Sequence, residues 1–147
     1  MNKLKILTFI TTGDRFLLLR NNPSDISHGG DFWFTVTGSV ESDETLKQAV
    51  KREVKEETSL MTDGIYPLNW GSKYSIDGIE YDEYNFLSSV NQSTVQLNKE
   101  HIEYKWLPLG QFVKEIAWSK NKDTLQKVLE LGLLHKNYFN KITFEIF

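Results

Sequence analysis

The sequence predicts a layered α/β domain in which β-strands are flanked by two helices. Short apolar runs rich in β-branched and aromatic residues alternate with turn residues over much of the chain, as strands do. Two longer segments instead repeat their apolar residues with the 3.6-residue period of a helix. With 147 residues the chain is long enough for one sizeable core, so we expect a single domain over 1–147.

The strands are predicted from β-prone runs bounded by glycine, proline or polar clusters. Gly13-Asp14 separates the first two runs, so the chain is expected to begin with a hairpin. A second turn signal, Asp77-Gly78, separates two later runs. The predicted strands are 3–12, 15–20, 32–37, 66–74, 81–90 and 104–107, with a polar loop over 21–31.

Two helices complete the predicted elements. The first spans 44–58, with Asp43 as its N-cap. The second ends at Leu134 after a cap at Ser119 or Asp123. Its apolar stripe consists of Leu125, Val128, Leu129 and Leu133.

The segment from Gly38 to Leu60 concentrates acidic residues at fixed spacing. It reads GSVESDETLKQAVKREVKEETSL, with Glu44 eight positions before an Arg-Glu-x-x-Glu-Glu cluster. On a helix, Glu53, Glu56 and Glu57 fall on the apolar side and Arg52 at its edge, whereas the lysines take the other side. The predicted apolar side carries Leu46, Ala49, Val50 and Val54, and the predicted solvent side carries Lys47, Gln48, Lys51, Lys55 and Thr58.

Acidic clusters on helices are usually solvated, but here the lysines already occupy the solvent side. The glutamates are therefore predicted to face the body of the protein or a cleft in it. Carboxylates at 4 Å from one another repel by about 4 kcal/mol per pair at an effective dielectric near 20, so the cluster needs cations.

The predicted cation is Mg²⁺, with Mn²⁺ as an alternative. Crowded carboxylates suit these ions better than zinc, since the chain has no cysteine and only three histidines, of which His101 and His135 are interpreted as surface residues. Mg²⁺ readily takes phosphate oxygens as further ligands, which indicates a polyphosphate substrate. Because no nucleophile or phosphate-binding glycine loop is found, the predicted chemistry is metal-assisted attack by water.

Composition limits the partners. The net charge is −3, from 17 basic and 20 acidic residues, and without a basic stripe we expect no nucleic-acid duplex as the main ligand. No run is long enough to span a membrane and no export signal is found, so a cytoplasmic location is expected. The segment 135–147 has apolar residues at strand spacing, and it is open whether it pairs within the domain, covers the site or forms a homodimer contact.

The acidic segment resembles the signature of the Nudix hydrolase superfamily at all but one place, where Ser59 replaces a glycine. A longer stretch is similar to the dihydroneopterin triphosphate pyrophosphatase branch of that superfamily. The matching residues are Phe32-Trp33, Val36-Thr37-Gly38-Ser39-Val40-Glu41, Arg52-Glu53-Val54-Lys55-Glu56-Glu57, Glu100-His101, Tyr104-Lys105-Trp106-Leu107 and Trp118-Ser119.

This resemblance implies an α/β/α sandwich with a mixed β-sheet between helices. It also implies a Mg²⁺-dependent pyrophosphohydrolase that cleaves dihydroneopterin triphosphate or a nucleoside triphosphate to a monophosphate and pyrophosphate. The alternatives are a Nudix housekeeping hydrolase of oxidised nucleoside triphosphates or dinucleoside polyphosphates, and a nucleotide-sensing module without turnover. The intact acidic cluster counts against the sensor, which should have lost some of its ligands.

The resemblance assigns roles to individual residues. Glu53 and Glu57 are expected to bind Mg²⁺, with Glu56 in the same cluster. Arg52 is expected to hold Glu53 by a charged hydrogen bond, a role that its position also favours. Glu100 lies outside the acidic segment and is expected to reach the metal and to serve as general base. Arg52, Glu56 and Glu100 are thus the expected catalytic residues, and Glu44 is expected to support the loop.

Substrate binding is predicted at four positions: Arg20, Thr37, Gly38 and Trp118. Arg20, or alternatively Lys3, would meet phosphate, and Thr37 would bond the substrate if its hydroxyl faces the cleft. Large rings are more often core than ligand contacts, but several are candidates for stacking on the substrate ring. They are Phe32, Trp33, Tyr81, Tyr84 and Trp118.

Overall fold

The computed structural model describes residues 2–25 and 29–134, and for Asn69 only the backbone. The strand spacing predicted for 135–147 therefore lies outside the described residues. The elements in chain order are β1 (Lys3–Thr12), β2 (Arg15–Asn21), β3 (Trp33–Phe34), β4 (Val36–Ser39), α1 (Leu46–Thr58), β5 (Thr62–Ile76), β6 (Ile79–Val90), β7 (His101–Pro108), α2 (Leu109–Glu115) and α3 (Lys122–Leu134).

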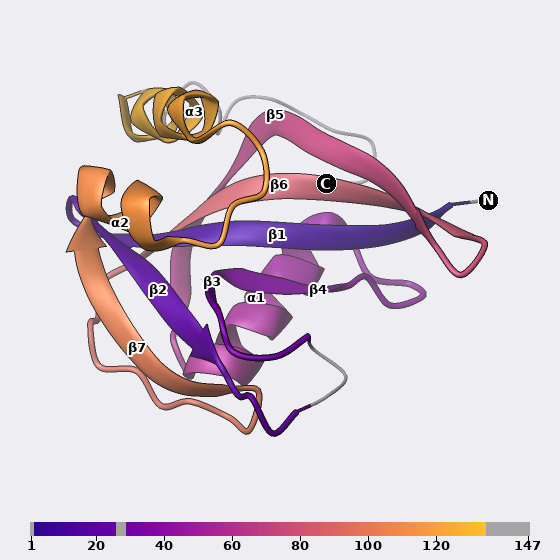
Figure 1. Ribbon diagram of the computed structural model, residues 1–147, viewed down its shortest axis with the longest axis horizontal. Helices are drawn as coiled ribbons and strands as arrows, with labels where there is room; N and C mark the ends of the chain where they lie inside the picture. Colours follow the sequence, from indigo (N-terminus) through magenta and orange to yellow (C-terminus); the bar gives the residue numbers. More distant parts are fainter. Residues whose placement is uncertain (1, 26–28, 135–147) are drawn as a thin grey trace.

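The described strands form one mixed sheet (Figure 1). Its main order is β3-β2-β1-β6-β5, while β4 pairs with β1 and β7 pairs with β2. The pairing of β1 with β6 is parallel, and the other pairs are antiparallel. No helix among the described residues is long and apolar enough to cross a membrane.

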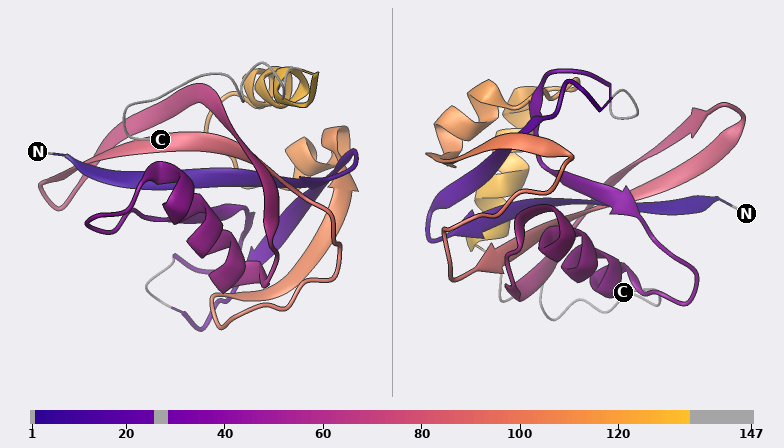
Figure 2. Two further views of the ribbon diagram at one scale, coloured as in Figure 1. Left: turned by 180° about the vertical axis from the view of Figure 1, so that it is seen from behind. Right: turned by 90° about the horizontal axis from the view of Figure 1, so that it is seen from below.

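Alternation along β1 builds two cores, one on each face of the sheet. Ile6 and Ile10 pack in a cluster with the apolar residues of α1. Leu7 and Phe9 point the other way and pack with α2 and α3. Because successive side chains of a strand point to opposite faces, a single apolar run can bind helices on both sides. Figures 1 and 2 show α1 on one face and the other two helices on the opposite face, which confirms the predicted sandwich.

Most predicted strands are confirmed. The hairpin at Gly13-Asp14 and the turn at Asp77-Gly78 both form, and the strands around the second turn are longer than predicted. The predicted strand 32–37 is divided into β3 and β4 at Thr35, whose Oγ1 donates to the Thr8 carbonyl at 2.6 Å. The short helix α2 has no counterpart among the predicted elements.

Both predicted helix caps are wrong. Thr45, not Asp43, caps α1: its hydroxyl accepts from the backbone N–H of Gln48 at 3.1 Å, and the Gln48 side chain accepts from the Thr45 N–H at 2.9 Å. Asp43 instead adopts a positive φ of 67°. At the start of α3, Asn121 Oδ1 accepts from the Thr124 N–H at 3.1 Å. In each case the residue directly before the first helical residue accepts from a free N–H group of the first turn.

Ser59 ends α1 in the left-handed conformation that a glycine normally takes. Its φ is 64°, and its N–H donates to the Lys55 carbonyl at 2.9 Å. Its hydroxyl also donates to the Gln96 carbonyl at 3.1 Å, which ties the helix end to the segment before β7. The substitution that departs from the family signature therefore leaves the helix end in place, and the acidic residues lie upstream of it.

Candidate active site

The last turns of α1 carry the acidic residues at different depths. Glu57 is buried, at 3% exposure, and the side chain of Glu53 is 13% exposed. The Glu56 side chain is 55% exposed, so the prediction that all three glutamates face inward is wrong for Glu56. Thr58 was expected on the solvent side but is fully buried, and its hydroxyl donates to the Val54 carbonyl at 2.6 Å within the helix.

Arg52 joins the acidic residues into one network. Its guanidinium donates to both carboxylate oxygens of Glu44, at 2.7 and 2.9 Å, and to Glu53 Oε1 at 2.8 Å. It also donates to the Ser39 carbonyl at 2.8 Å and lies 3.4 Å from Glu56. A planar guanidinium has enough donors for all of these partners. Arg52 therefore fixes Glu53 and connects the loop after β4 to the helix.

Gly38 in β4 gives room to Glu53. A Cβ at position 38 would lie 2.2 Å from the Glu53 carboxyl carbon, closer than any real contact. Position 38 therefore requires a glycine, because the Glu53 side chain of α1 approaches β4 closely there.

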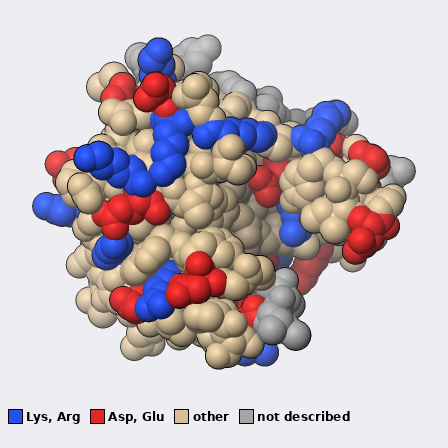
Figure 3. Space-filling model, in the orientation of Figure 1, with Lys and Arg blue, Asp and Glu red and all other residues tan. Residues whose placement is uncertain are grey.

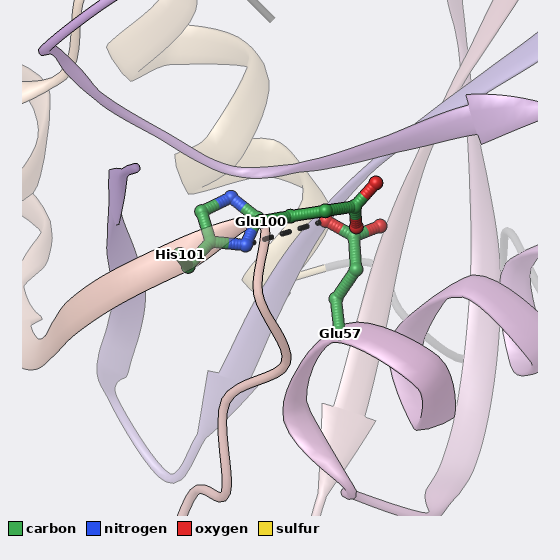
Figure 4. A group of neighbouring side chains, drawn as sticks. All are labelled: Glu57, Glu100 and His101. Atoms are coloured by element: carbon green, nitrogen blue, oxygen red, sulfur yellow. Dashed lines mark ion pairs between the residues drawn. The ribbon is translucent and has the colours of Figure 1, made fainter. Parts of the chain in front are cut away.

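A second part of the site comes from the start of β7. One ligand atom from each of Glu57, Glu100 and His101 lies within 4.8 Å of the others (Figure 4). His101 Nδ1 is 3.6 Å from Glu57 Oε1, and the imidazole side chain is only 8% exposed. The interpretation of His101 as a surface residue is therefore wrong. The pairing of Asn21 with His101 between β2 and β7 brings this segment to the end of α1.

Glu100 is held in place by polar residues that the sequence did not indicate. Asn98 accepts from the Glu100 N–H at 3.0 Å, and its Nδ2 donates to Glu100 Oε2 at 3.3 Å. Asn22 fixes the backbone on the other side, since its N–H donates to the Glu100 carbonyl at 2.9 Å and its Nδ2 to the Lys99 carbonyl at 2.8 Å. The carboxylate therefore points to Glu57 from a segment fixed at both sides.

Burial and crowding set the protonation of these groups. Burial raises the pKa of Glu57 to about 10, and the negative charges of Glu100 and Glu53 act in the same direction. Burial also raises the pKa of Glu53, against the lowering effect of Arg52. By contrast, the hydrogen bonds from Arg52 lower the pKa of Glu44, which supports a structural rather than a ligand role for that carboxylate.

The cluster opens into a cavity of about 300 Å³. Thr37, Glu57 and Glu100 all line it, so the structure brings these three predicted residues together. The remaining lining residues are Asn21, Phe32, Phe34, Thr35, His101 and Ala117. Of these, only Phe32 was considered for substrate contact, and Asn21 and Phe34 carried no recognisable motif.

Two further predicted residues lie away from this cavity. Arg20 is paired with Asp31, by two hydrogen bonds of 2.8 and 2.9 Å, and with Glu103. Trp118 packs among aromatic rings and lines a second cavity of about 280 Å³, which shares Phe34 and Ala117 with the first.

The donor set fits a divalent cation. Glu57 Oε2 is buried and has no hydrogen-bond partner among the described residues, although a buried carboxylate oxygen ordinarily has one. The Glu100 carboxylate and the His101 imidazole offer further oxygen and nitrogen ligands within reach of the same point. Oxygen-rich sets of this kind suit Mg²⁺ and Mn²⁺, and a nitrogen ligand is compatible with Mn²⁺.

The fold is that of the Nudix hydrolases. The chain superposes on a C. elegans Ap4A hydrolase with a TM-score of 0.70 at 24% identity, covering 90% of this chain and 98% of that one. It superposes on the E. coli dihydroneopterin triphosphate pyrophosphohydrolase with a TM-score of 0.66 at 25% identity, covering 88% of this chain and 99% of that one.

The sequence comparison gives the family. The family model of the NUDIX domain matches residues 1–128, so the chain belongs to the NUDIX domain family. It is also similar to the dihydroneopterin triphosphate diphosphatase of Haemophilus influenzae, with 28% identity over 145 residues, 87% of this chain and 88% of that protein. The resemblance noted from the acidic segment is thereby confirmed for the superfamily.

Proposed function

We propose that the protein is a Mg²⁺-dependent pyrophosphohydrolase that cleaves dihydroneopterin triphosphate or a nucleoside triphosphate to the monophosphate and pyrophosphate. The chain is an enzyme that hydrolyses phosphoric anhydride bonds, as its family and its diphosphatase relatives indicate. The proposal of Mg²⁺-dependent triphosphate cleavage rests mainly on one observation. The buried Glu57 carboxyl lies beside Glu100, at the wall of a cavity large enough for a substrate.

In this proposal each acidic residue has a distinct task. Glu53, Glu57 and Glu100 would hold the divalent ion, with His101 within reach of the same point. Glu56, at the exposed edge, would add negative charge for an ion that enters from solvent. When bound, the ion supplies charge neutralisation for the phosphate chain and for the leaving pyrophosphate.

The proton acceptor for the attacking water is proposed to be Glu100. It lies outside α1, and Asn98 holds its carboxylate toward the cavity. Arg52 orients Glu53 by a charge-assisted hydrogen bond and does not itself line the cavity. Thr37, at the cavity wall, is proposed to donate its hydroxyl to a substrate oxygen.

A substrate panel tests the proposal. It should contain dihydroneopterin triphosphate, standard and oxidised nucleoside triphosphates, diadenosine polyphosphates and ADP-ribose, each with Mg²⁺. We expect triphosphates to be turned over fastest, with pyrophosphate rather than orthophosphate as the second product. Glu57→Gln should abolish turnover of every substrate, because it replaces a charged ligand with a neutral amide of the same shape.

Different outcomes reject different parts of the proposal. Preferred turnover of diadenosine polyphosphates or ADP-ribose would contradict the triphosphate assignment but not the hydrolytic site. Binding of nucleotides without release of any phosphate product would contradict the proposed catalysis and would favour a sensing module.

A further inference from the structure

A second cavity continues the metal-site cavity along the sheet. The two share Phe34 and Ala117, and the second holds Glu83 of β6 and Trp118. The register of the sheet aligns Ser39 of β4 with Lys5 of β1 and Lys5 with Glu83. Since neighbouring strands lie about 4.8 Å apart, the backbone of Glu83 is about 10 Å from the backbone of Ser39, at the end of β4. Figure 3 shows this face, which is hollowed beside the β5–β6 hairpin, with charged side chains reaching the hollow.

Glu83 is an unusual residue for the wall of a cavity. Its side chain is partly buried, and among the described residues its carboxylate accepts a long hydrogen bond of 3.4 Å from the Tyr74 hydroxyl. Burial raises the pKa of Glu83, while the positive charges of Lys5 and Lys120 oppose this effect. An ionised carboxylate can accept about four hydrogen bonds, so acceptor positions of Glu83 remain for a ligand in the cavity.

The rest of the cavity offers a flat apolar surface and one donor. Trp118 lies nearly parallel to Phe34, with an interplanar angle of 19° and ring centroids 6.1 Å apart. The Trp118 Nε1–H is buried and has no hydrogen-bond partner within the part of the chain that the structure describes. Its neighbour across the rim is Lys120, whose Nζ donates to Ser72 Oγ at 2.7 Å. A matching ligand is a planar ring with N–H donors for Glu83 and a carbonyl acceptor for Trp118.

We propose that the Glu83 carboxylate recognises the ring of the substrate by accepting hydrogen bonds from it. The cavity would bind a ring with two adjacent N–H donors beside a carbonyl. This is the 2-amino-4-oxopyrimidine edge, which guanine and pterins share and adenine lacks. The inference rests on the proposed function, because it assigns the ring of a substrate whose phosphates lie in the adjoining cavity.

Two nucleotides that differ by one amino group test the inference. GMP carries the complete edge, whereas IMP lacks the 2-amino group, and neither has an anhydride bond to cleave in Mg²⁺. Calorimetric titration of the full chain should give GMP an affinity about tenfold to a hundredfold higher than that of IMP, the effect of one hydrogen bond to a charged acceptor. Glu83→Gln should abolish that preference, mainly by weakening GMP. Neopterin, which has the same edge, should compete with GMP.

The matched control is Glu80→Gln, which removes an exposed carboxylate of the same strand and should bind both nucleotides as the unaltered chain does. Equal affinities for GMP and IMP in the unaltered chain would overturn the inference, even if the variant failed to fold. The inference would also be overturned if Glu83→Gln kept the preference for GMP, or if neopterin did not compete with GMP. Hydrolysis is measured separately, so a chain that discriminates the rings without turnover would contradict only the proposed function.

Discussion

At the scale of the residue, the site depends on two close approaches and one network. Gly38 admits the Glu53 side chain, and Arg52 fixes that side chain through the same guanidinium that binds Glu44. Glu57 is buried with its neighbours Glu100 and His101, which come from a distant part of the sequence. Glu53 thus depends on Gly38 and Arg52, which are not metal ligands, whereas the neighbours of Glu57 are further candidate ligands.

A methyl group at Gly38 tests the first approach. In Gly38→Ala the Cβ would overlap the Glu53 carboxyl group, which is held by Arg52 and must move. We expect Mn²⁺ affinity and activity to fall at least about tenfold, as when a partner of a metal ligand is lost. The control is Gly110→Ala, where a Cβ would meet no atom within 4 Å. Equal Mn²⁺ affinities of the two variants would show that Glu53 is not needed at this place.

Asn98 offers a test of how Glu100 is positioned. Asn98→Ala removes the two hydrogen bonds that the Asn98 side chain makes to this residue. We expect kcat to fall about tenfold and KM to change little, since the phosphate contacts remain. Steady-state kinetics of Asn98→Ala and of Asn91→Ala, a substitution in the exposed turn after β6, give the comparison. An unchanged kcat in Asn98→Ala would argue against Glu100 as the proton acceptor.

At the scale of the element, α1 carries most of the site, and its ends are well defined. The reciprocal bonds of Thr45 and Gln48 begin the helix, and Ser59 ends it in a left-handed conformation. The start of β7 then supplies the remaining ligands, because β7 pairs with β2 along nearly its whole length. The helix and this strand are separately anchored, so the geometry between them is set by the sheet.

Removing the cap should affect stability and leave the chemistry intact. Thr45→Ala loses the side-chain acceptor for the Gln48 N–H and is expected to cost about 1 kcal/mol, or about 2 to 4 °C in Tm. Turnover at 25 °C should stay close to that of the unaltered chain, because the ligands lie in the last turns of the helix. Thermal unfolding of Thr45→Ala and of Ser42→Ala, an exposed residue before the cap, checks this. A large loss of activity at a temperature where Thr45→Ala is fully folded would contradict this prediction.

The sequence predicted elements well where one local signal decided the outcome. The β-prone run of residues 3–12 and the turn at Asp77-Gly78 are local signals, and both predictions are confirmed. The helix α2 is too short to show a period, and the caps were assigned to residues two positions from those that reach the free N–H groups.

The site could be predicted only in part, because half of it is non-local. The spacing in α1 predicts that Glu53 and Glu57 lie together, and these are the two less exposed of its three acidic residues. The depth of His101 and the support of Glu100 by Asn98 follow from strand pairing and loop conformation, which no spacing along the chain encodes. Only the resemblance of Glu100-His101 to a known family indicated that segment.

At the scale of the whole molecule, metal binding and folding should be coupled through Glu57. In the folded chain without metal its pKa is raised to about 10 from an ordinary 4.5, so the folded state keeps a proton that the unfolded state releases. Stability without metal should therefore fall as the pH rises between about 5 and 10. A bound cation replaces that proton, and its stabilising effect should grow with pH.

Thermal unfolding at pH 6 and pH 9, with EDTA and with Mg²⁺, measures this coupling. We expect the Tm in EDTA to be lower at pH 9 and the increase on adding Mg²⁺ to be larger there. Glu57→Gln, which cannot ionise, should show a smaller change on both counts. A Mg²⁺ effect that is independent of pH, or one that the variant retains, would show that Glu57 does not exchange a proton for the ion.

The most direct test of the site is a titration of Mn²⁺ followed by electron paramagnetic resonance, with the unaltered chain and Glu57→Gln. Free Mn²⁺ gives the signal, so its loss counts the bound ion without any need for turnover. We predict saturable binding by the unaltered chain and at least a tenfold weaker affinity in the variant. Absence of binding by the unaltered chain, or equal affinity in both proteins, would contradict a metal site built around Glu57.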